Sequence, residues 1–552
     1  MISKEYGKFR AREKVRRFPK DTSLSIIVPK GANYGYDIIS AVGLGSFLEG
    51  RKLSDIQQEL ASQIPHFNIP YSSLYDQQKK FLYYFGELHR ASMPLIKDYL
   101  DSFGKISWLI DGTVEQGSDV FFGVKECQKD ILLDCYKIAT ENETDIVKCL
   151  LDVGANFGRP FDIIHDLSQA IRNACKTAYS DIIQRVCHFH FTRDVGNDLY
   201  DQPHDMLFKQ LKKIKLKVHL KDQRRNQSKW LRNRVDDKDN LIVEKLLKGI
   251  DIPTIDNEIF VRELFLSLNH WLLDYANDGK RQGYPFDPYL LYFHRRSITV
   301  HHAVKRILES SVSESDIPKC LMYLSTRLES YLSDPQIIKA SSLYEKAFSI
   351  FSDIRVSLRL LDGAKSSAPI YESYEISSLQ QREILKNISD LKGQLNTQMQ
   401  SIDDEKEKKL YEIASKHIEK YEPYLINESN INDNTEKITR TTNKLEQAWG
   451  SAKRTKRQIT GKKKLTREFN ALPKEYMLVQ NLKNPDYVDL VLGDIEKLPQ
   501  KLADVGSHAK SFSSWLKKQD IKNLGRISKN TLRKDNFIED LVEISKNSFN
   551  AN

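Results

Sequence analysis

The stretch SWLIDGTVEQGSDVFFGVKE, residues 107–126, predicts a β-strand, a short polar turn and a second β-strand. The first strand carries an acidic residue, Asp111, directly after Leu109 and Ile110. A carboxylate in the buried part of a sheet is unfavourable unless it is paired, hydrogen-bonded or bound to a metal ion. Asp111 also fits a turn-forming Asp-Gly pair, so the rest of the sequence has to decide between a turn and a functional site.

Short strands and helices alternate around this stretch. Three strand-like segments come first, and helix–strand repeats follow. The predicted segments are, in order, 106–114, 120–126, 131–139, 144–158, 160–166, 167–179 and 181–191. This β-β-β-α-β-α-β order predicts an α/β sheet of the ribonuclease H type, in which the first and fourth strands are neighbours. Asp111 and Asp166 are therefore expected to face each other at the ends of adjacent strands.

Helices dominate the rest of the sequence. Residues 36–90 predict amphipathic helices joined by a turn, one of them capped by Ser72 or Ser73, which fits a DNA-binding helix-turn-helix. A seven-residue apolar spacing between 384 and 402, followed by a charged break, predicts a helical hairpin.

The sequence is expected to contain six segments. These are a basic N-terminal segment (1–35), a helix-turn-helix-like domain (36–100), the first part of the ribonuclease H-like domain (101–200), an all-helical insertion (201–435), a helix that completes the ribonuclease H-like domain (436–470) and a helical C-terminal region (471–552).

Composition excludes several classes of protein. The 552 residues are 40% hydrophobic, which is enough for ordinary cores, and no apolar run reaches the roughly 18 residues of a membrane span. The basic start of the sequence is not followed by an apolar signal region, so we expect a cytoplasmic protein. The six cysteines form no CxxC pair, which predicts reduced thiols instead of a disulfide framework or a zinc ribbon.

Positive charge is concentrated in two runs. The formal net charge is +10; residues 209–238 contain twelve Lys and Arg against three acids, and residues 440–468 contain ten against two. One basic run is most often a solvated helix face. Two dense runs and a basic N-terminus together favour a polyanionic partner such as DNA, with an affinity that depends strongly on salt.

Chemistry at a phosphodiester normally needs a third carboxylate, because two metal ions about 3.5 to 4 Å apart have to be held. Glu446 is the best candidate, since it lies in the first turns of a predicted helix within the second basic run. Lys453 and Arg457 fall on the same face of that helix.

The second and third acids each have alternatives in the sequence. Asp162 lies on the same predicted strand as Asp166, but Asp166 stands at the strand's end and opens a helix. Glu436 and Glu468 are available in the same basic region as Glu446.

The segments WLIDGT, IIHDLSQAI, QRVCHFHFTRD and TTNKLE together resemble a DDE transposase of the group that includes the Mutator, hAT and P-element enzymes. In that group a large helical insertion interrupts the ribonuclease H fold before the final Glu. The segment HWLLDYANDGKRQGYPFDPYL, residues 270–290, resembles the insertion region of prokaryotic members. The resemblance covers residues 36–515, but there is no Cys-rich N-terminal zinc module, so recognition of DNA ends is expected elsewhere, for example in residues 36–90.

The resemblance implies roles for individual residues. Asp111, Asp166 and Glu446 correspond to the metal-binding catalytic triad, and Cys187 with His190 corresponds to an accessory motif after the second Asp. A zinc site built on the cluster Cys187, His188 and His190 is the alternative, although a tetrahedral site needs about four ligands. The expected DNA-binding residues are Lys453, Arg454, Arg457, Lys462, Lys463, Arg224, Arg225 and Trp271. Trp271 also fits a core position; its functional alternative is stacking on an unpaired base.

The sequence thus predicts a Mg²⁺- or Mn²⁺-dependent transposase that cleaves phosphodiester bonds at transposon ends and transfers the 3′-ends into target DNA. Its expected partner is double-stranded DNA, on which it forms a dimer or larger assembly, in the cytoplasm of a prokaryote and associated with the nucleoid. Alternatives are a ribonuclease H-like nuclease or resolvase without strand transfer, a domesticated DNA-binding protein without chemistry, and a helical scaffold with solvated basic faces.

Overall fold

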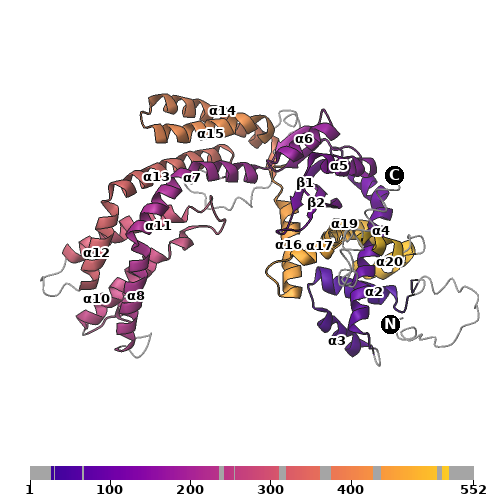
Figure 1. Cartoon of the computed structure of the whole chain (residues 1–552), viewed down its shortest axis with the longest axis horizontal. Helices are drawn as coiled ribbons and strands as arrows, with labels where there is room; N and C mark the ends of the chain where they lie inside the picture. Colours follow the sequence, from indigo (N-terminus) through magenta and orange to yellow (C-terminus); the bar gives the residue numbers. More distant parts are fainter. Residues whose placement is uncertain are drawn as a thin grey trace, which may run out of the picture. The chain divides into compact units, whose positions relative to one another are not determined.

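The computed structural model of the chain describes residues 27–520, apart from 30–31, 65–67, 235–240, 254, 310–318, 361–374, 427–436 and 507–511. Most of the predicted N-terminal segment 1–35 lies outside the described residues. The described chain is mostly helical, with a mixed five-stranded sheet (Figure 1). It divides into two compact units: residues 1–160 with 445–552, called the first unit, and residues 161–444, called the second unit. Among the described helices, none has the length and apolar character needed to cross a membrane.

The five-stranded sheet has the order β3-β2-β1-β4-β5. Its strands are β1 (Ser107–Thr113), β2 (Val120–Glu126), β3 (Leu132–Ile138), β4 (Asp162–His165) and β5 (Ile183–Val186). Strands β1, β2 and β3 pair antiparallel, and β4 and β5 pair parallel. Helix α5 (Glu143–Phe157) follows β3, and helix α6 (Gln169–Ala178) connects β4 to β5, so the elements come in the order expected from the alternating pattern.

Asp111 lies inside β1 and not in a turn. The strand continues through Gly112 to Thr113, and the chain turns at residues 114–119, where Gly117 has a φ of 79°. The turn interpretation of Asp111 is therefore wrong. In the β1–β2 pair Asp111 lies directly opposite Gly123.

The first unit is built from two distant pieces of the chain. Its helices, some of which are short 3-10 or π-helical turns, are α2 (Tyr36–Gly43), η2 (Leu44–Leu48), α3 (Leu53–Gln63), α4 (Tyr71–Asp101), α5, α16 (Asn443–Thr460), α17 (Thr466–Ala471), α18 (Glu475–Leu478), η9 (Val479–Lys483), α19 (Pro485–Leu492), η10 (Ile495–Lys497), α20 (Leu498–Gly506) and α21 (Phe512–Asp520). Helix α16 starts two residues before the division between the units.

Helix α4 is longer than the sequence pattern indicates. It begins at Tyr71 after Pro70, which occupies the N-cap position, so the expected caps Ser72 and Ser73 lie inside the helix. Proline before the first turn has a preset φ, and no side chain caps this end. Fifteen of the 31 residues of α4 are buried, among them Phe81 and Phe85, whose rings stack. The helix therefore forms much of the core of the first unit.

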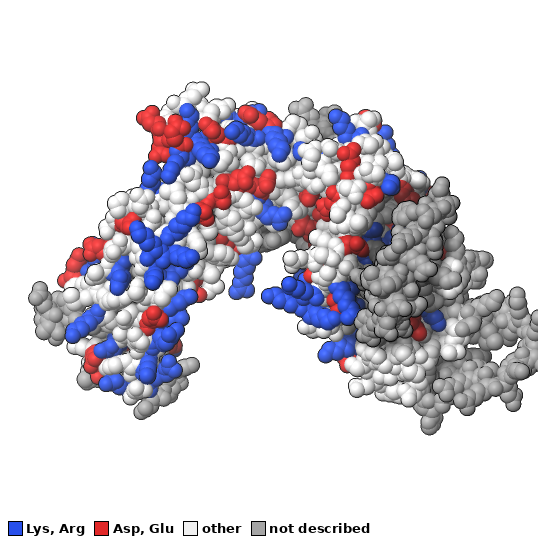
Figure 2. Space-filling model, in the orientation of Figure 1, with Lys and Arg blue, Asp and Glu red and all other residues white. Residues whose placement is uncertain are grey.

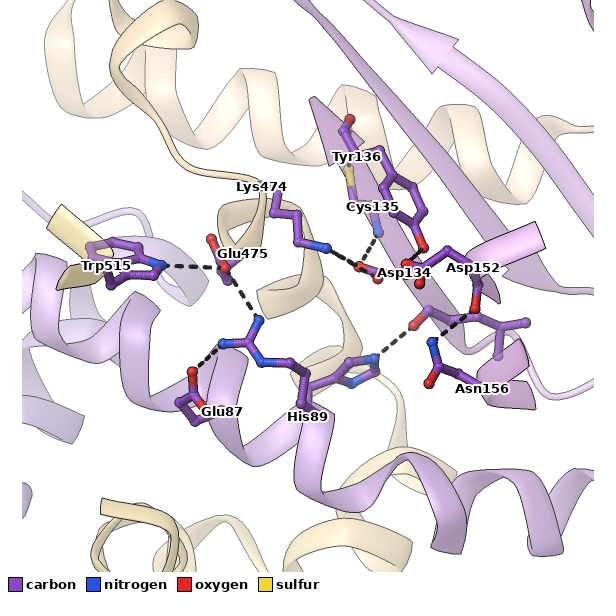
Figure 3. Close-up of polar contacts among 12 residues, drawn as sticks. Glu87, His89, Asp134, Cys135, Tyr136, Asp152, Asn156, Lys474, Glu475 and Trp515 are labelled. Atoms are coloured by element: carbon purple, nitrogen blue, oxygen red, sulfur yellow. Dashed lines mark hydrogen bonds and ion pairs between the residues drawn. The ribbon is translucent and has the colours of Figure 1, made fainter. Parts of the chain in front are cut away.

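A buried polar cluster joins the two chain pieces of the first unit (Figure 3). Asp134 on β3 forms an ion pair with Lys474, with 3.1 Å between Oδ2 and Nζ. The ring nitrogens of His89 on α4 lie 2.9 Å from the Tyr487 hydroxyl and 2.7 Å from the Leu133 carbonyl. Burial lowers the pKa of His89, so one ring nitrogen donates to the carbonyl and the other accepts from the hydroxyl.

The second unit is almost wholly helical apart from its strands. Its further elements are α7 (His188–Ile214), α8 (Leu216–Arg232), α9 (Ile242–Leu247), α10 (Asn257–Leu273), η4 (Tyr275–Asp278), α11 (Tyr289–Glu309), α12 (Lys319–Leu332), α13 (Pro335–Ser357), β6 (Glu375–Ser377), α14 (Ser378–Ser401), α15 (Glu405–Leu425) and β7 (Lys437–Thr439). Strands β6 and β7 pair antiparallel. Helices α14 and α15 pack side by side, which confirms the predicted hairpin (Figure 1).

One strand of the predicted sheet is shorter than expected. The sequence pattern predicts a strand throughout 181–191, but β5 ends at Val186 and α7 begins at His188. Phe191, Val195 and Leu199 are buried at helical spacing, and this apolar stripe decides in favour of a helix after Cys187.

Candidate active site

The carboxylate of Asp111 is placed by the β1–β2 pair of the first unit. Asp111 is 8% exposed, and its direct cross-strand partner is Gly123. Residues directly opposite each other in an antiparallel pair project from the same face of the sheet. Whatever lies over Gly123 therefore lies beside the Asp111 side chain.

Helix α16 occupies that place. A Cβ atom built on Gly123 would lie 2.5 Å from Cζ2 and 2.6 Å from Cη2 of Trp449, so the indole rests directly on the glycine. Glu446 comes three residues before Trp449 and Lys453 four residues after it, which puts all three on one face of the helix. The first unit thus presents the Glu446 face of α16 to the face of β1–β2 that carries Asp111.

Charges around Lys453 agree with this placement. Burial lowers the pKa of Lys453, and the nearby carboxylates of Glu115 and Asp111 act in the opposite direction. An electrostatic interaction between Lys453 on α16 and Asp111 on β1 requires that the two elements be close.

The second unit contains the two candidates for the second acid, and they differ sharply. Asp162 is 0% exposed and forms an ion pair with Arg185 on β5, with 2.6 Å between Oδ2 and Nη2. Asp166 follows the end of β4, is half-buried, and accepts a hydrogen bond at Oδ1 from the backbone N–H of Ser168 at 2.8 Å. A carboxylate already held by a buried guanidinium is a poor metal ligand, so the alternative that placed Asp162 in the site loses its support.

The Cys-His motif after β5 contacts the segment that leads into α16. The backbone N–H of Thr442 points at the sulfur of Cys187, with an N–Sγ distance of 3.3 Å. The hydroxyl of Thr442 lies 3.5 Å from Nδ1 of His190. Burial alone raises the pKa of the Cys187 thiol, but His190 and Thr442 together bring that pKa below its ordinary value.

The Cys-His motif and the third acid belong to different units. Cys187 and His190 lie in the second unit, and Glu446 lies in the first. Thiol and imidazole ligands suit Zn²⁺ more than Mg²⁺, so the Cys-His motif carries no argument for Mg²⁺.

The two alternatives to Glu446 are Glu468 and Glu436, and the structure describes only the first of them. Glu468 on α17 forms an ion pair with Lys462. Burial raises the pKa of Glu468, but the hydrogen bond from Lys462, a backbone hydrogen bond and the charges of Lys462 and Lys456 together lower it. Glu436 lies outside the described residues.

The basic residues expected to bind DNA on α16, and in the segment just after its end at Thr460, fall into two groups. Lys453 and Arg457 point at the turn between β1 and β2, where Lys453 donates to the Val114 carbonyl at 2.9 Å and Arg457 pairs with Glu115 at 2.6 Å. Arg454 and Lys463 are exposed. Figure 2 shows Lys and Arg side chains gathered over α16.

The expected DNA-binding residues of the second unit lie on α8 and α10. Arg225 is exposed, Arg224 is half-buried, and both lie on α8. Trp271 on α10 is 44% exposed, with the guanidinium of Arg296 4.4 Å from its ring centre. The core interpretation of Trp271 is therefore wrong, and one part of the ring is accessible.

Two residues that connect these elements are not indicated by any local pattern in the sequence. Glu115 lies in the turn after β1 and contacts α16, and Arg185 holds Asp162 and donates to the Thr439 carbonyl on β7. Both have partners more than 20 residues away in sequence, which no local spacing reveals.

No protein-family model matches the chain, and no curated protein matches it in sequence.

Proposed function

We propose that the chain is a DNA transposase of the DDE type, with Asp111, Asp166 and Glu446 as its catalytic acids. The observation that carries this proposal lies within the first unit. Trp449 rests on Gly123 directly opposite Asp111, and Glu446 is on the Trp449 face of the same helix. Two acids more than 330 residues apart in sequence are thereby turned toward one face of one strand pair.

The strand order supports the placement of the second acid. β1 and β4 are neighbours in the sheet, as a ribonuclease H-type arrangement requires, and Asp166 directly follows β4. The large helical region between β5 and α16 agrees with a helical insertion before the last acid.

The donor chemistry of the three acids fits the proposed cofactor. Mg²⁺ and Mn²⁺ prefer oxygen ligands, and three carboxylates supply only oxygen. Divalent ions held there would lower the pKa of an attacking water or hydroxyl and stabilise charge on the leaving oxygen.

The chain's own residues then have separate tasks. The carboxylates hold the ions, the packed Trp449 fixes the helix that carries Glu446, and exposed basic residues hold the DNA backbone. Hydrolysis leaves a 3′-hydroxyl at the transposon end, and that hydroxyl attacks a target phosphodiester. Each step forms one P–O bond and breaks one, so the same acids serve both steps.

Further properties belong to the same proposal. Two transposon ends have to be joined, so an assembly of at least two copies on DNA is expected. Double-stranded DNA is the partner, and association with a prokaryotic nucleoid follows from that partner.

The decisive experiment uses a plasmid that carries the gene together with its flanking DNA, incubated with Mg²⁺ or Mn²⁺. The wild-type chain is expected to nick or cut at the flanks and to join the released 3′-ends to a second plasmid. Asp111→Asn, Asp166→Asn and Glu446→Gln are each expected to abolish cleavage and leave DNA binding intact. Glu468→Gln is the matched control, because it removes the alternative acid and is expected to retain cleavage.

Each other outcome identifies a rival. Cleavage without joining would indicate a nuclease or resolvase of the ribonuclease H type. DNA binding without any cleavage by the wild type would indicate a DNA-binding protein without chemistry. Salt-insensitive or absent DNA binding would indicate a helical scaffold.

A further inference from the structure

The turn between β1 and β2 carries an acidic residue, Glu115, that contacts α16 at several points. Its Oε1 atom lies 2.6 Å from Nη2 of Arg457 and 3.7 Å from Nζ of Lys453. Its Oε2 atom lies 3.4 Å from the backbone nitrogen of Leu465, just before α17. The Glu115 side chain is 12% exposed, so these contacts are largely shielded from water.

The backbone of the same turn makes further contacts with α16 and the segment after it. These contacts and those of Glu115 are together called the joint. Lys453 donates to the Val114 carbonyl, and Thr466 donates from its hydroxyl to the Gln116 carbonyl at 2.7 Å. Asn470 accepts from the backbone N–H of Asp119 at 3.0 Å. The turn is thus fastened to α16 and α17 along its length, and all of these residues belong to the first unit.

The two basic residues at the joint already have partners there: Arg457, whose side chain is 38% exposed, is held by Glu115 and donates from Nε to the Lys463 carbonyl at 3.2 Å. The Lys453 side chain is 18% exposed, and its amino group is committed to the Val114 carbonyl and Glu115. Burial already lowers the pKa of Lys453, so the charge of this group depends on the carboxylates beside it. Arg454 lies on the exposed side of the same helix, and Lys463 and Lys464 are exposed beyond its end.

We infer that Glu115 is a positioning residue that locks α16 onto the β1–β2 turn, and that Lys453 and Arg457 serve this joint and not the DNA backbone. The inference rests on the proposed function, since its catalytic consequence is the orientation of Glu446 beside Asp111. Contact with phosphates on this helix then falls to Arg454 and the exposed lysines that follow α16.

A stability measurement tests the joint without reference to function. Glu115→Gln and Arg457→Gln are each expected to lower the melting temperature of the full chain by about 2 to 4 °C. The double variant is expected to lose no more than one single variant, because the two side chains act as a pair. Asp101→Asn is the matched control: it removes the Lys97–Asp101 ion pair, which lies exposed on α4 of the same unit, and is expected to change the melting temperature little. Additive losses at Glu115 and Arg457 would overturn the joint.

The salt dependence of DNA binding tests the division of labour, with a random-sequence DNA duplex as the probe. Neutralising one phosphate contact lowers the slope of log affinity against log salt by about 1. Arg454→Gln and Lys463→Gln are expected to do so, whereas Lys453→Gln and Arg457→Gln leave the slope unchanged. A slope reduced by Lys453→Gln, together with tighter DNA binding by Glu115→Gln, would overturn the inference and make Glu115 a competitor of phosphate.

Cleavage kinetics test the positioning role. Glu115→Gln is expected to lower kcat about tenfold or more with an unchanged DNA Kd, since a displaced Glu446 disturbs chemistry and not binding. Glu115→Asp keeps the carboxylate and is expected to recover part of the rate. An unchanged kcat in Glu115→Gln would refute the role. If the wild type neither binds nor cleaves DNA, the proposed function fails, while the stability measurement still decides whether the joint exists.

Discussion

Asp111 and Gly123 face each other across β1 and β2, and the missing side chain of Gly123 admits the Trp449 ring beside the acid. A glycine inside a strand normally weakens it, since it has no side chain to pack. At this position the close approach of an indole explains the residue. The position of helix α16 therefore depends on the absence of a side chain at Gly123.

Gly123→Ala is expected to displace α16. The added Cβ would stand 2.5 Å from the indole, and such overpacking costs about 1 to 3 kcal/mol of unfolding free energy. Cleavage is expected to fall more than stability does, because Glu446 moves with the helix. Plasmid cleavage and urea denaturation measure the two effects.

The chain offers a matched control on the same helix. A Cβ atom added to Gly450 would point into open space, so Gly450→Ala is expected to keep activity and to raise stability by about 0.5 to 1 kcal/mol. Full cleavage by Gly123→Ala would contradict the proposed placement of α16.

Substitution of Asp162 is expected to lower the unfolding free energy, whereas substitution of Asp166 is expected to abolish cleavage. Asp162→Asn leaves Arg185 as a buried charge without its carboxylate, which typically costs about 3 to 5 kcal/mol. Asp166→Asn is expected to keep the unfolding free energy nearly unchanged and to abolish cleavage. Denaturation curves and cleavage rates of both variants check this pair; a stable, active Asp166→Asn enzyme would remove Asp166 from the site.

Acid is expected to destabilise the second unit through His188. This side chain is fully buried, its Nε2 lies 2.7 Å from the Leu425 carbonyl, and burial, then the charge of Arg440, lowers its pKa to about 3. Below the unfolded pKa of about 6.5 the unfolded chain takes up a proton that the folded chain does not. The unfolding free energy should therefore fall as pH drops from about 6.5 toward 3, by about 1.4 kcal/mol per pH unit.

The variant His188→Gln isolates this contribution. Glutamine can still donate to the Leu425 carbonyl but does not titrate, so the variant is expected to be less stable at pH 7 and less sensitive to acid than the wild type. Urea denaturation at pH 7, 6 and 5 gives the comparison. Equal acid sensitivity in the two proteins would assign the effect to other groups.

Helix α8 is expected to contact the DNA backbone without reading sequence. Arg224→Ala and Arg225→Ala should each weaken binding to unrelated duplexes alike and lower the salt slope by about 1. Lys386→Ala is the control, because Lys386 is exposed on α14 outside both basic runs. A slope that changes equally in all three variants would mean that binding follows net charge and not a defined surface.

Local patterns predicted the parts of the fold that local patterns control. Alternating apolar residues predicted the strands around Asp111, and the seven-residue spacing predicted the α14–α15 hairpin. The segment after Val186 alternates like a strand for a few residues, but the longer apolar stripe that includes Phe191 and Val195 makes it a helix. A short stretch of sequence does not show whether the strand pattern or the helix pattern prevails.

Partners remote in sequence were beyond prediction. No local pattern indicates that Lys453 and Arg457 meet Glu115, since Arg457 follows Glu115 by 342 residues along the chain. Nor does any spacing show that Arg185 neutralises Asp162, because that pairing follows from the parallel register of β4 and β5. Tertiary packing decides these contacts, and with them which charges remain accessible.

The first unit is formed from two separate stretches of the chain, and this has a consequence for its biosynthesis. Its strands β1–β3 leave the ribosome long before α16 and Lys474, whereas the second unit is one continuous segment, residues 161–444. Asp134 and the sheet face beside Asp111 must therefore wait for their C-terminal partners while the intervening helices are translated. The acids of the proposed site are brought together at the end of synthesis, so a nascent or prematurely terminated chain would carry no assembled catalytic centre.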